Sequence, residues 1–124
     1  VGSNNALNSL DSANNPSLVF LDCNENSLTG LYLSNNTELQ QLYCSGNLLT
    51  VLDLSNNLAL QKLFCGGNLL TALDIFNNNS LAELNFASMP SLFKVCVWAL
   101  PFPPAGVTVD TAGSPDVYFT MSCN

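Results

Sequence analysis

The stretch that decides the fold is NNTELQQLYCSGNLLTVLDLSNNLALQKLFCGGNLLTALDIF, residues 35–76. It holds two copies of a 21-residue unit, and each copy has two halves that follow the pattern L-x-x-L-x-L/C-x-x-N. The L-x-L/C segment alternates every second residue, as a β-strand does, and the asparagine after it indicates a turn. The unit therefore predicts two short strands per coil, joined by tight turns, and no sustained helical period.

The same unit continues in both directions along the chain. Asn-Asn pairs begin copies at residues 14, 35, 56 and 77, and residues 7–15 match the second half of an earlier copy. One coil cannot bury its own apolar face, so several coils must stack. We predict an all-β-like repeat solenoid of about four coils with two short parallel strands per coil and little or no α-helix. It should span residues 1–97, with a non-repeat C-terminal cap at 98–124 in the same structural domain.

The spacing also assigns side chains to columns. Leucines and three cysteines should point inward and form the core. Two columns of asparagine should form ladders at the turns, where a side-chain amide can pair with backbone groups that the bend leaves unpaired. The first ladder is Asn26, Asn47 and Asn68, and the second is Asn15, Asn36, Asn57 and Asn78. We assign these asparagines a structural role.

The repeated string LxxLxCxxNxLTxLDLSNN resembles the leucine-rich-repeat family. It is most similar to the internalin-like repeats of surface and secreted proteins from Bacteroidetes. The resemblance covers residues 7 to about 97; the fourth copy departs from it at Met89 and gains one residue before Leu92. It implies protein–protein or surface recognition, usually as part of a longer secreted chain, and it implies no particular ligand.

The charge of the chain excludes several classes of partner. The net charge is −7, and Lys62 and Lys94 are the only basic residues. Nucleic acid binding needs a basic surface, which is missing here, and docking on an anionic membrane is disfavoured for the same reason. No apolar run reaches the roughly 18 residues of a membrane span, so we expect no membrane insertion. No signal peptide is visible within this sequence.

Catalytic motifs are also missing from the sequence. The chain has no histidine, which excludes Ser-His-Asp and Cys-His arrangements, and it has no phosphate-binding glycine loop. Asp53 and Asp74 share an outward column, and paired carboxylates can serve glycoside hydrolysis. We interpret these two as solvated surface acids. The sequence therefore predicts no enzyme, no cofactor and no metal site.

The five cysteines are of two kinds. Cys23, Cys44 and Cys65 stand 21 residues apart at inward positions, where a thiol packs as a small hydrophobe. A straight column does not provide the convergent ligands that zinc needs. Cys96 falls at an outward position and should form a disulfide with Cys123 in the tail, stabilising the fold by about 3 kcal/mol. A disulfide favours a secreted or cell-surface location.

The outward columns of the first strand are the candidate binding residues. They comprise Asp22, Tyr43, Phe64 and Asn85, with Gln41 and Lys62 beside them. Adjacent coils should place the Tyr43 and Phe64 rings side by side, and exposed rings among polar groups suit sugars or peptides. The same rings also fit ordinary cross-strand packing.

The leading hypothesis for function is a non-catalytic recognition or adhesion module that binds a protein or glycan partner outside the cell. One alternative is a structural spacer within a larger surface protein. A further alternative is ice binding by Asn and Thr ladders, although Thr29, Thr50 and Thr71 form only a single threonine column. The sequence leaves the oligomeric state and the ligand open.

Overall fold

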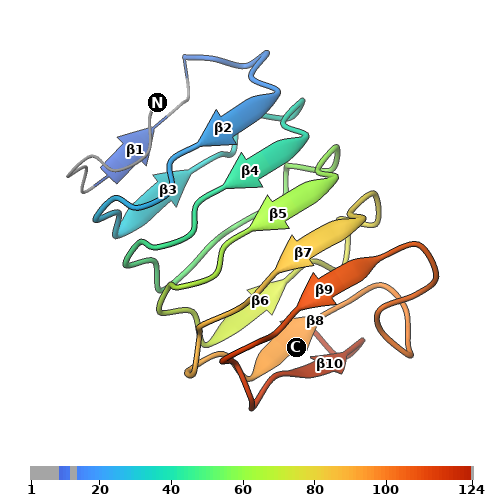
Figure 1. The fold of residues 1–124 in the computed structure, drawn as a ribbon. Coiled ribbons are helices and arrows are strands. Elements are labelled where there is room, and N and C mark those ends of the chain that lie inside the picture. Colours follow the sequence, from blue (N-terminus) through green and yellow to red (C-terminus); the bar gives the residue numbers. More distant parts are fainter. Residues whose placement is uncertain (1–8, 12–13, 124) are drawn as a thin grey trace.

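A computed structural model describes residues 9–11 and 14–123 and shows a parallel β-solenoid of the leucine-rich-repeat type. Figure 1 shows two rows of strands, and the arrows of one row run opposite to those of the other, as expected for a chain that coils. The described residues form no helix, so no helix there could cross a membrane. The predicted fold class is confirmed.

One layer of the solenoid is a continuous parallel sheet. It contains five strands of three residues each, and neighbouring strands pair in register. These strands are β2 (Phe20–Asp22), β4 (Gln41–Tyr43), β5 (Lys62–Phe64), β7 (Glu83–Asn85) and β9 (Thr108–Asp110). The central residues Leu21, Leu42, Leu63 and Leu84 face each other along the ladder, as the 21-residue spacing requires.

The other layer is interrupted. It consists of a two-stranded and a three-stranded parallel sheet. The strands are β1 (Ser9–Asp11), β3 (Gly30–Tyr32), β6 (Ala72–Asp74), β8 (Lys94–Cys96) and β10 (Tyr118–Thr120). Residues 51–53 lie between the two sheets and are not a strand, although Leu52 still points inward. The prediction of two strands in every coil is therefore wrong at residues 51–53. A buried leucine can hold this segment against the core without ladder hydrogen bonds on both sides.

The core is a set of stacked apolar columns between the two layers. Every inward leucine of the central coils is buried, and Cys23, Cys44 and Cys65 have no exposed surface. Full burial of a leucine side chain is worth about 1.5–3 kcal/mol, so these columns supply most of the stabilisation. The fourth copy carries the larger Phe86 in the cysteine column and Met89 in the turn column, and both are fully buried.

The asparagine ladders are buried inside the turns, except for Asn15, which is exposed. The Nδ2 of Asn47 donates to the carbonyls of Cys23 and Cys44, both at 3.0 Å, and its Oδ1 accepts from the backbone N–H of Leu28 at 3.0 Å. At the other turn, the Nδ2 of Asn57 donates to the carbonyls of Leu33 at 3.0 Å and Asn36 at 2.9 Å. Each amide thus links its own coil to the preceding one.

The C-terminal segment continues both layers. Strand β9 pairs with β7 and strand β10 with β8, so residues after 97 add a further coil. These strands lie in the stretches VTVD, residues 107–110, and VYFT, residues 117–120. A ring cluster of Trp98, Phe102 and Phe119 packs against the core at this end, with centroid distances of 5.3 and 4.8 Å. The division of one structural domain into a solenoid at 1–97 and a cap at 98–124 stays a prediction.

Candidate binding face

The outer surface of the five-stranded sheet carries the candidate residues from the sequence. Strand register places Asp22, Tyr43, Phe64 and Asn85 in one column. A second column runs beside it and contains Phe20, Gln41, Lys62 and Glu83. We call the part of this surface formed by Phe20, Tyr43, Phe64, Gln41 and Lys62 the aromatic face.

Three rings form a continuous cluster on the aromatic face. The Tyr43 and Phe64 centroids are 5.0 Å apart with the ring planes at 86°, and the Phe20 and Tyr43 centroids are 5.3 Å apart at 66°. These are edge-to-face contacts, which add about 0.5–1.5 kcal/mol to a ring pair. Phe20 is half exposed, and the other two rings are partly exposed. The cluster is therefore packed on its sides and open to solvent on top.

The two central rings occupy positions where other coils of this layer have a capping side chain. Asp22, Asn85 and Asp110 each accept a hydrogen bond through Oδ1 from the backbone N–H two residues later, at 3.1, 2.8 and 2.9 Å. Such bonds hold the chain in the turn after a strand. Tyr43 and Phe64 have no carboxylate or amide for this purpose. In the Tyr43 coil the Ser45 N–H donates instead to Asn24 Oδ1 of the preceding coil at 2.7 Å. The central coils thus carry aromatic rings where the flanking coils carry a side chain that caps its own turn.

Polar groups frame the rings. The Tyr43 hydroxyl donates to Oε1 of Gln41 at 3.1 Å, and Nζ of Lys62 lies 3.5 Å from Oε1 of Glu83. The Lys62–Glu83 pair is exposed, so it contributes little stability of its own. Hydrogen-bonding groups and apolar rings therefore lie side by side on a surface with one cation.

The acids on the opposite layer have a structural role. Asp53 and Asp74 each accept a hydrogen bond at 2.9 Å, from the backbone N–H groups of Ser55 and Phe76. The hydrogen bonds from Ser55 lower the pKa of Asp53, so this carboxyl is ionised at neutral pH. A general acid for glycoside hydrolysis needs a raised pKa, and Asp53 has the opposite shift.

A shallow groove, which the sequence pattern does not indicate, crosses this opposite layer. Its volume is about 460 Å³, and it runs over three successive coils. It is lined by residues that include Val51, Asp53, Asp74 and Lys94. The interruption of the sheet at residues 51–53 lies within it. The groove could not be predicted from the sequence of any one coil, because it depends on how neighbouring coils are spaced.

The cysteines divide as the strand register predicted. Cys96 and Cys123 form a disulfide with a Cα–Cα distance of 5.4 Å. Cys23, Cys44 and Cys65 are free and buried. Burial raises the pKa of the Cys23 thiol to about 11, with a smaller contribution from Asp22, and burial raises that of Cys65 to about 12. The three thiols are therefore protonated and act as packing groups.

Taken together, the register, the columns and the ladders define a leucine-rich-repeat-like β-solenoid with an internal cysteine column. One similar solved structure is the functional domain of InlJ from Listeria monocytogenes, which includes a cysteine ladder. The two share 25% sequence identity with a TM-score of 0.70, and the match covers 87% of this chain and 28% of that chain. No protein-family model matches the chain, and no curated protein matches it in sequence.

Proposed function

We propose that this chain is a non-catalytic recognition module that acts outside the cell and binds its partner through the aromatic face. The observation that carries the proposal is the open cluster of Phe20, Tyr43 and Phe64 on the one continuous sheet among the described residues. Aromatic residues dominate binding energy at interfaces because they bury a large rigid surface at low entropic cost.

The exchange of capping groups for rings supports a binding role. A hydrogen bond of this kind contributes about 0.5–1.5 kcal/mol to stability. The flanking coils carry this bond, and the two central coils carry a partly exposed ring instead. In the free protein the edge-to-face contacts of each ring offset that energy in part, and the exposed part of the ring contributes further when a partner covers it.

The ring geometry favours a protein partner over a glycan. Sugar rings stack on a flat aromatic surface, whereas these rings stand at 66° and 86° to one another and present a ridged surface. Apolar or arginine side chains can insert between such edges, and Gln41, Lys62 and Glu83 offer hydrogen bonds and charges around them. We therefore propose a protein ligand first and keep the glycan as the alternative.

An extracellular location is supported by the Cys96–Cys123 disulfide and by the resemblance of the repeats to internalin-like surface proteins. Because the chain spans only 28% of the InlJ chain that it matches, it also fits the role of one segment in a longer protein. A structural spacer is the second candidate function. A spacer would use the stabilising contacts between the rings but not their exposed surface.

A binding screen with matched variants tests the proposal. Wild-type protein is presented to an array of purified extracellular proteins and to a glycan array, beside the Tyr43→Ala/Phe64→Ala double variant. The control is Phe93→Ala/Tyr118→Ala, which removes an exposed ring pair of 6.3 Å centroid distance from the other layer. We expect partners whose affinity falls by about thirtyfold or more in the first variant, as for a hot spot of 2 kcal/mol.

The outcomes separate the candidates. Loss of binding in the first variant and retention in the control supports the aromatic face, and the array that responds shows whether the ligand is a protein or a glycan. Equal binding by wild type and the Tyr43→Ala/Phe64→Ala variant, with both folded by circular dichroism, contradicts it. No binding partner on either array favours the spacer.

A further inference from the structure

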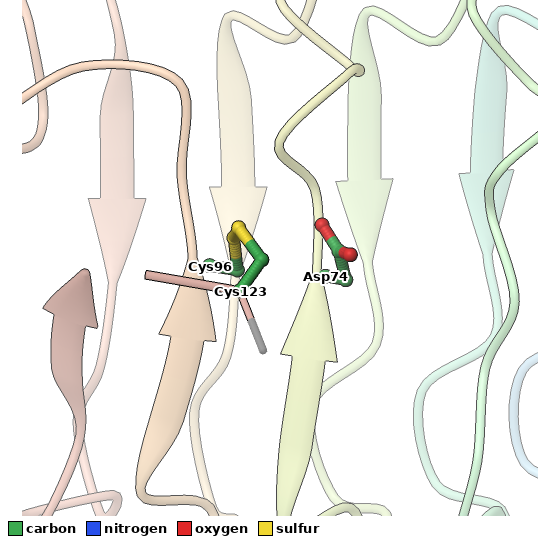
Figure 2. Close-up of side chains that lie close together, drawn as sticks. All are labelled: Asp74, Cys96 and Cys123. Carbon is green, nitrogen blue, oxygen red and sulfur yellow. A yellow bond between two sulfur atoms is a disulfide. The ribbon is translucent and has the colours of Figure 1, made fainter. Parts of the chain in front are cut away.

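A second site of different chemistry lies at the C-terminal end of the other layer. Asp74 in β6 and Cys96 in β8 are direct partners in the parallel ladder, and Cys123 is bonded to Cys96. One carboxylate oxygen and the two Sγ atoms all lie within 4.8 Å of one another. Figure 2 shows the Asp74 carboxylate beside the disulfide, with each group coming from a different segment.

Two of the three residues are accessible from solvent. All three line the groove of about 460 Å³, together with Lys94. Asp74 and Cys123 are exposed, whereas Cys96 is almost fully buried. Cys123 follows β10, which ends at Thr120, so this ligand lies outside the regular ladder while the other two are held by paired strands.

We propose that reduction of the Cys96–Cys123 disulfide turns this cluster into a binding site for one divalent ion of the zinc class. The two thiolates and the Asp74 carboxylate supply three ligands, and water takes the fourth position. Zinc prefers this mixture of sulfur and oxygen donors in a tetrahedral arrangement, with bonds of about 2.0–2.3 Å. Three donor atoms already within 4.8 Å of one another need only small movements to converge on one ion.

The reducing step requires a dithiol reductant. One thiolate of the dithiol attacks the exposed Sγ of Cys123, the Cys96–Cys123 bond breaks, and Cys96 leaves as a thiolate. The second thiol of the reductant then attacks the mixed disulfide and releases Cys123. Two electrons pass to the protein, and the reductant becomes a disulfide. Binding of the ion displaces the protons of the two thiols, so affinity should rise with pH.

The other possible ligands of soft metals do not compete in the folded protein. The chain contains no histidine. Cys23, Cys44 and Cys65 are buried in the core, where desolvation keeps them protonated. Reduced, folded protein should therefore bind one ion per chain, at the cluster of Asp74, Cys96 and Cys123.

Cobalt(II) serves as the probe because thiolate ligands give it sulfur-to-metal charge-transfer absorption. The whole chain is reduced anaerobically with a phosphine, which takes up the oxygen of one water molecule and leaves two thiols, and is then titrated with Co²⁺. The variants are Cys123→Ser and Asp74→Asn, and the matched control is Asp53→Asn, an acid of the same groove in the adjacent coil. Oxidised wild type and a circular dichroism spectrum of each form complete the set.

We expect one Co²⁺ per chain with charge-transfer bands in reduced wild type and in Asp53→Asn. Oxidised wild type should show no such bands. Asp74→Asn should bind at least tenfold more weakly, and Cys123→Ser should lose one thiolate from the charge-transfer intensity with a similar or larger loss of affinity. The proposal is overturned if reduced wild type binds no Co²⁺ or unfolds, or if Cys123→Ser or oxidised protein binds as well as reduced wild type.

Discussion

At the residue scale, one position in each turn requires a left-handed backbone. It lies directly before the ladder residue, which is an asparagine in the first three coils, then Met89 and Ser114. Glycine occupies the position in three of the five coils, and Glu25 and Ser88 occupy it in the other two. The φ angles are 55° at Glu25, 69° at Gly46, 65° at Gly67, 57° at Ser88 and 78° at Gly113. L-residues pay about 1–2 kcal/mol for this conformation, so glycine is favoured wherever no side chain is needed.

The central glycine can be tested directly. Gly67→Ala should lower the free energy of unfolding by about 1–2 kcal/mol, because a Cβ at this φ is strained and approaches the Gly46 nitrogen to 3.3 Å. Ser88→Ala, in the same column, already has a Cβ and should change stability little. Urea unfolding measures both. Equal effects of the two substitutions would contradict the requirement for glycine.

The buried thiols predict a dependence of stability on pH. Burial raises the pKa of Cys65 from 9.0 to about 12, and desolvation, with the neighbouring Cys65 and Cys23, raises that of Cys44 well above 9.0. The folded state holds these protons more tightly than the unfolded chain. The corresponding stability is thus fully present below the unfolded pKa and is lost as pH rises above it towards the folded value.

We expect the free energy of unfolding to fall above about pH 9, by up to about 1.4 kcal/mol per pH unit for each thiol. Cys65→Ala should lower stability at neutral pH but show a shallower decline at alkaline pH. Urea unfolding at several pH values measures the slope, and tyrosine ionisation affects both proteins alike. Identical slopes would show that the thiol does not contribute.

At the element scale, each turn depends on its ladder amide. The Nδ2 of Asn68 donates to the carbonyls of Cys44 at 3.0 Å and Cys65 at 2.8 Å, and its Oδ1 accepts from the Leu49 N–H at 3.1 Å. The next coil has Met89 there, which cannot make these bonds. In the C-terminal coil, Ser114 Oγ donates to Phe86 O at 2.6 Å and accepts from Met89 N at 2.8 Å. The Ser114 hydroxyl of the last coil thus supplies hydrogen bonds to backbone groups that Met89 cannot bind.

Removal of one ladder amide should be costly. Asn68→Ala leaves several buried backbone groups without their partner, at about 1–3 kcal/mol for each unsatisfied group, so we expect a loss of at least 2–4 kcal/mol. Asn56→Ala, which removes a single exposed bond of 3.1 Å to Ser34 O, is the control and should cost about 0.5 kcal/mol or less. Thermal unfolding compares the two, and a mild effect of Asn68→Ala would argue against a structural ladder.

At the scale of the whole molecule, the last coil is tied to the rest by the disulfide. It joins β8 to the segment after β10 across a separation of 27 residues. In a solenoid, stability is the sum of the coils and of the interfaces between neighbours, and a terminal coil has only one neighbour. A covalent tie is therefore most useful at an end.

Cys123→Ser should lower the stability of oxidised protein by about 3–4 kcal/mol, from the entropy of the unfolded chain. Hydrogen exchange should show the loss mainly in β9 and β10, because the central coils keep both neighbours. Reduced wild type should behave like the variant in the absence of metal. Uniform loss of protection along the chain would indicate instead that all coils unfold together.

The solenoid, its register and the pairing of Cys96 with Cys123 could all be predicted from the amino-acid sequence. They follow from local periodicity. A 21-residue repeat with inward residues at fixed places allows one way to stack the coils, and it leaves Cys96 as the one repeat cysteine that points outward and can pair with the tail. The assignment of Tyr43 and Phe64 to neighbouring outward positions follows in the same way. Whether they bind a partner stays a prediction.

Features that depend on contacts between unlike segments could not be predicted from the repeat pattern and became evident in the folded chain. The tail has no repeat motif, yet it continues both layers, because strands pair through backbone groups that any sequence supplies. Likewise, the sequence predicted no metal site, since Asp74, Cys96 and Cys123 are distant in the chain and follow no ligand spacing. Stacking brings their atoms within 4.8 Å, and the interrupted ladder at residues 51–53 lies in the groove that all three residues line.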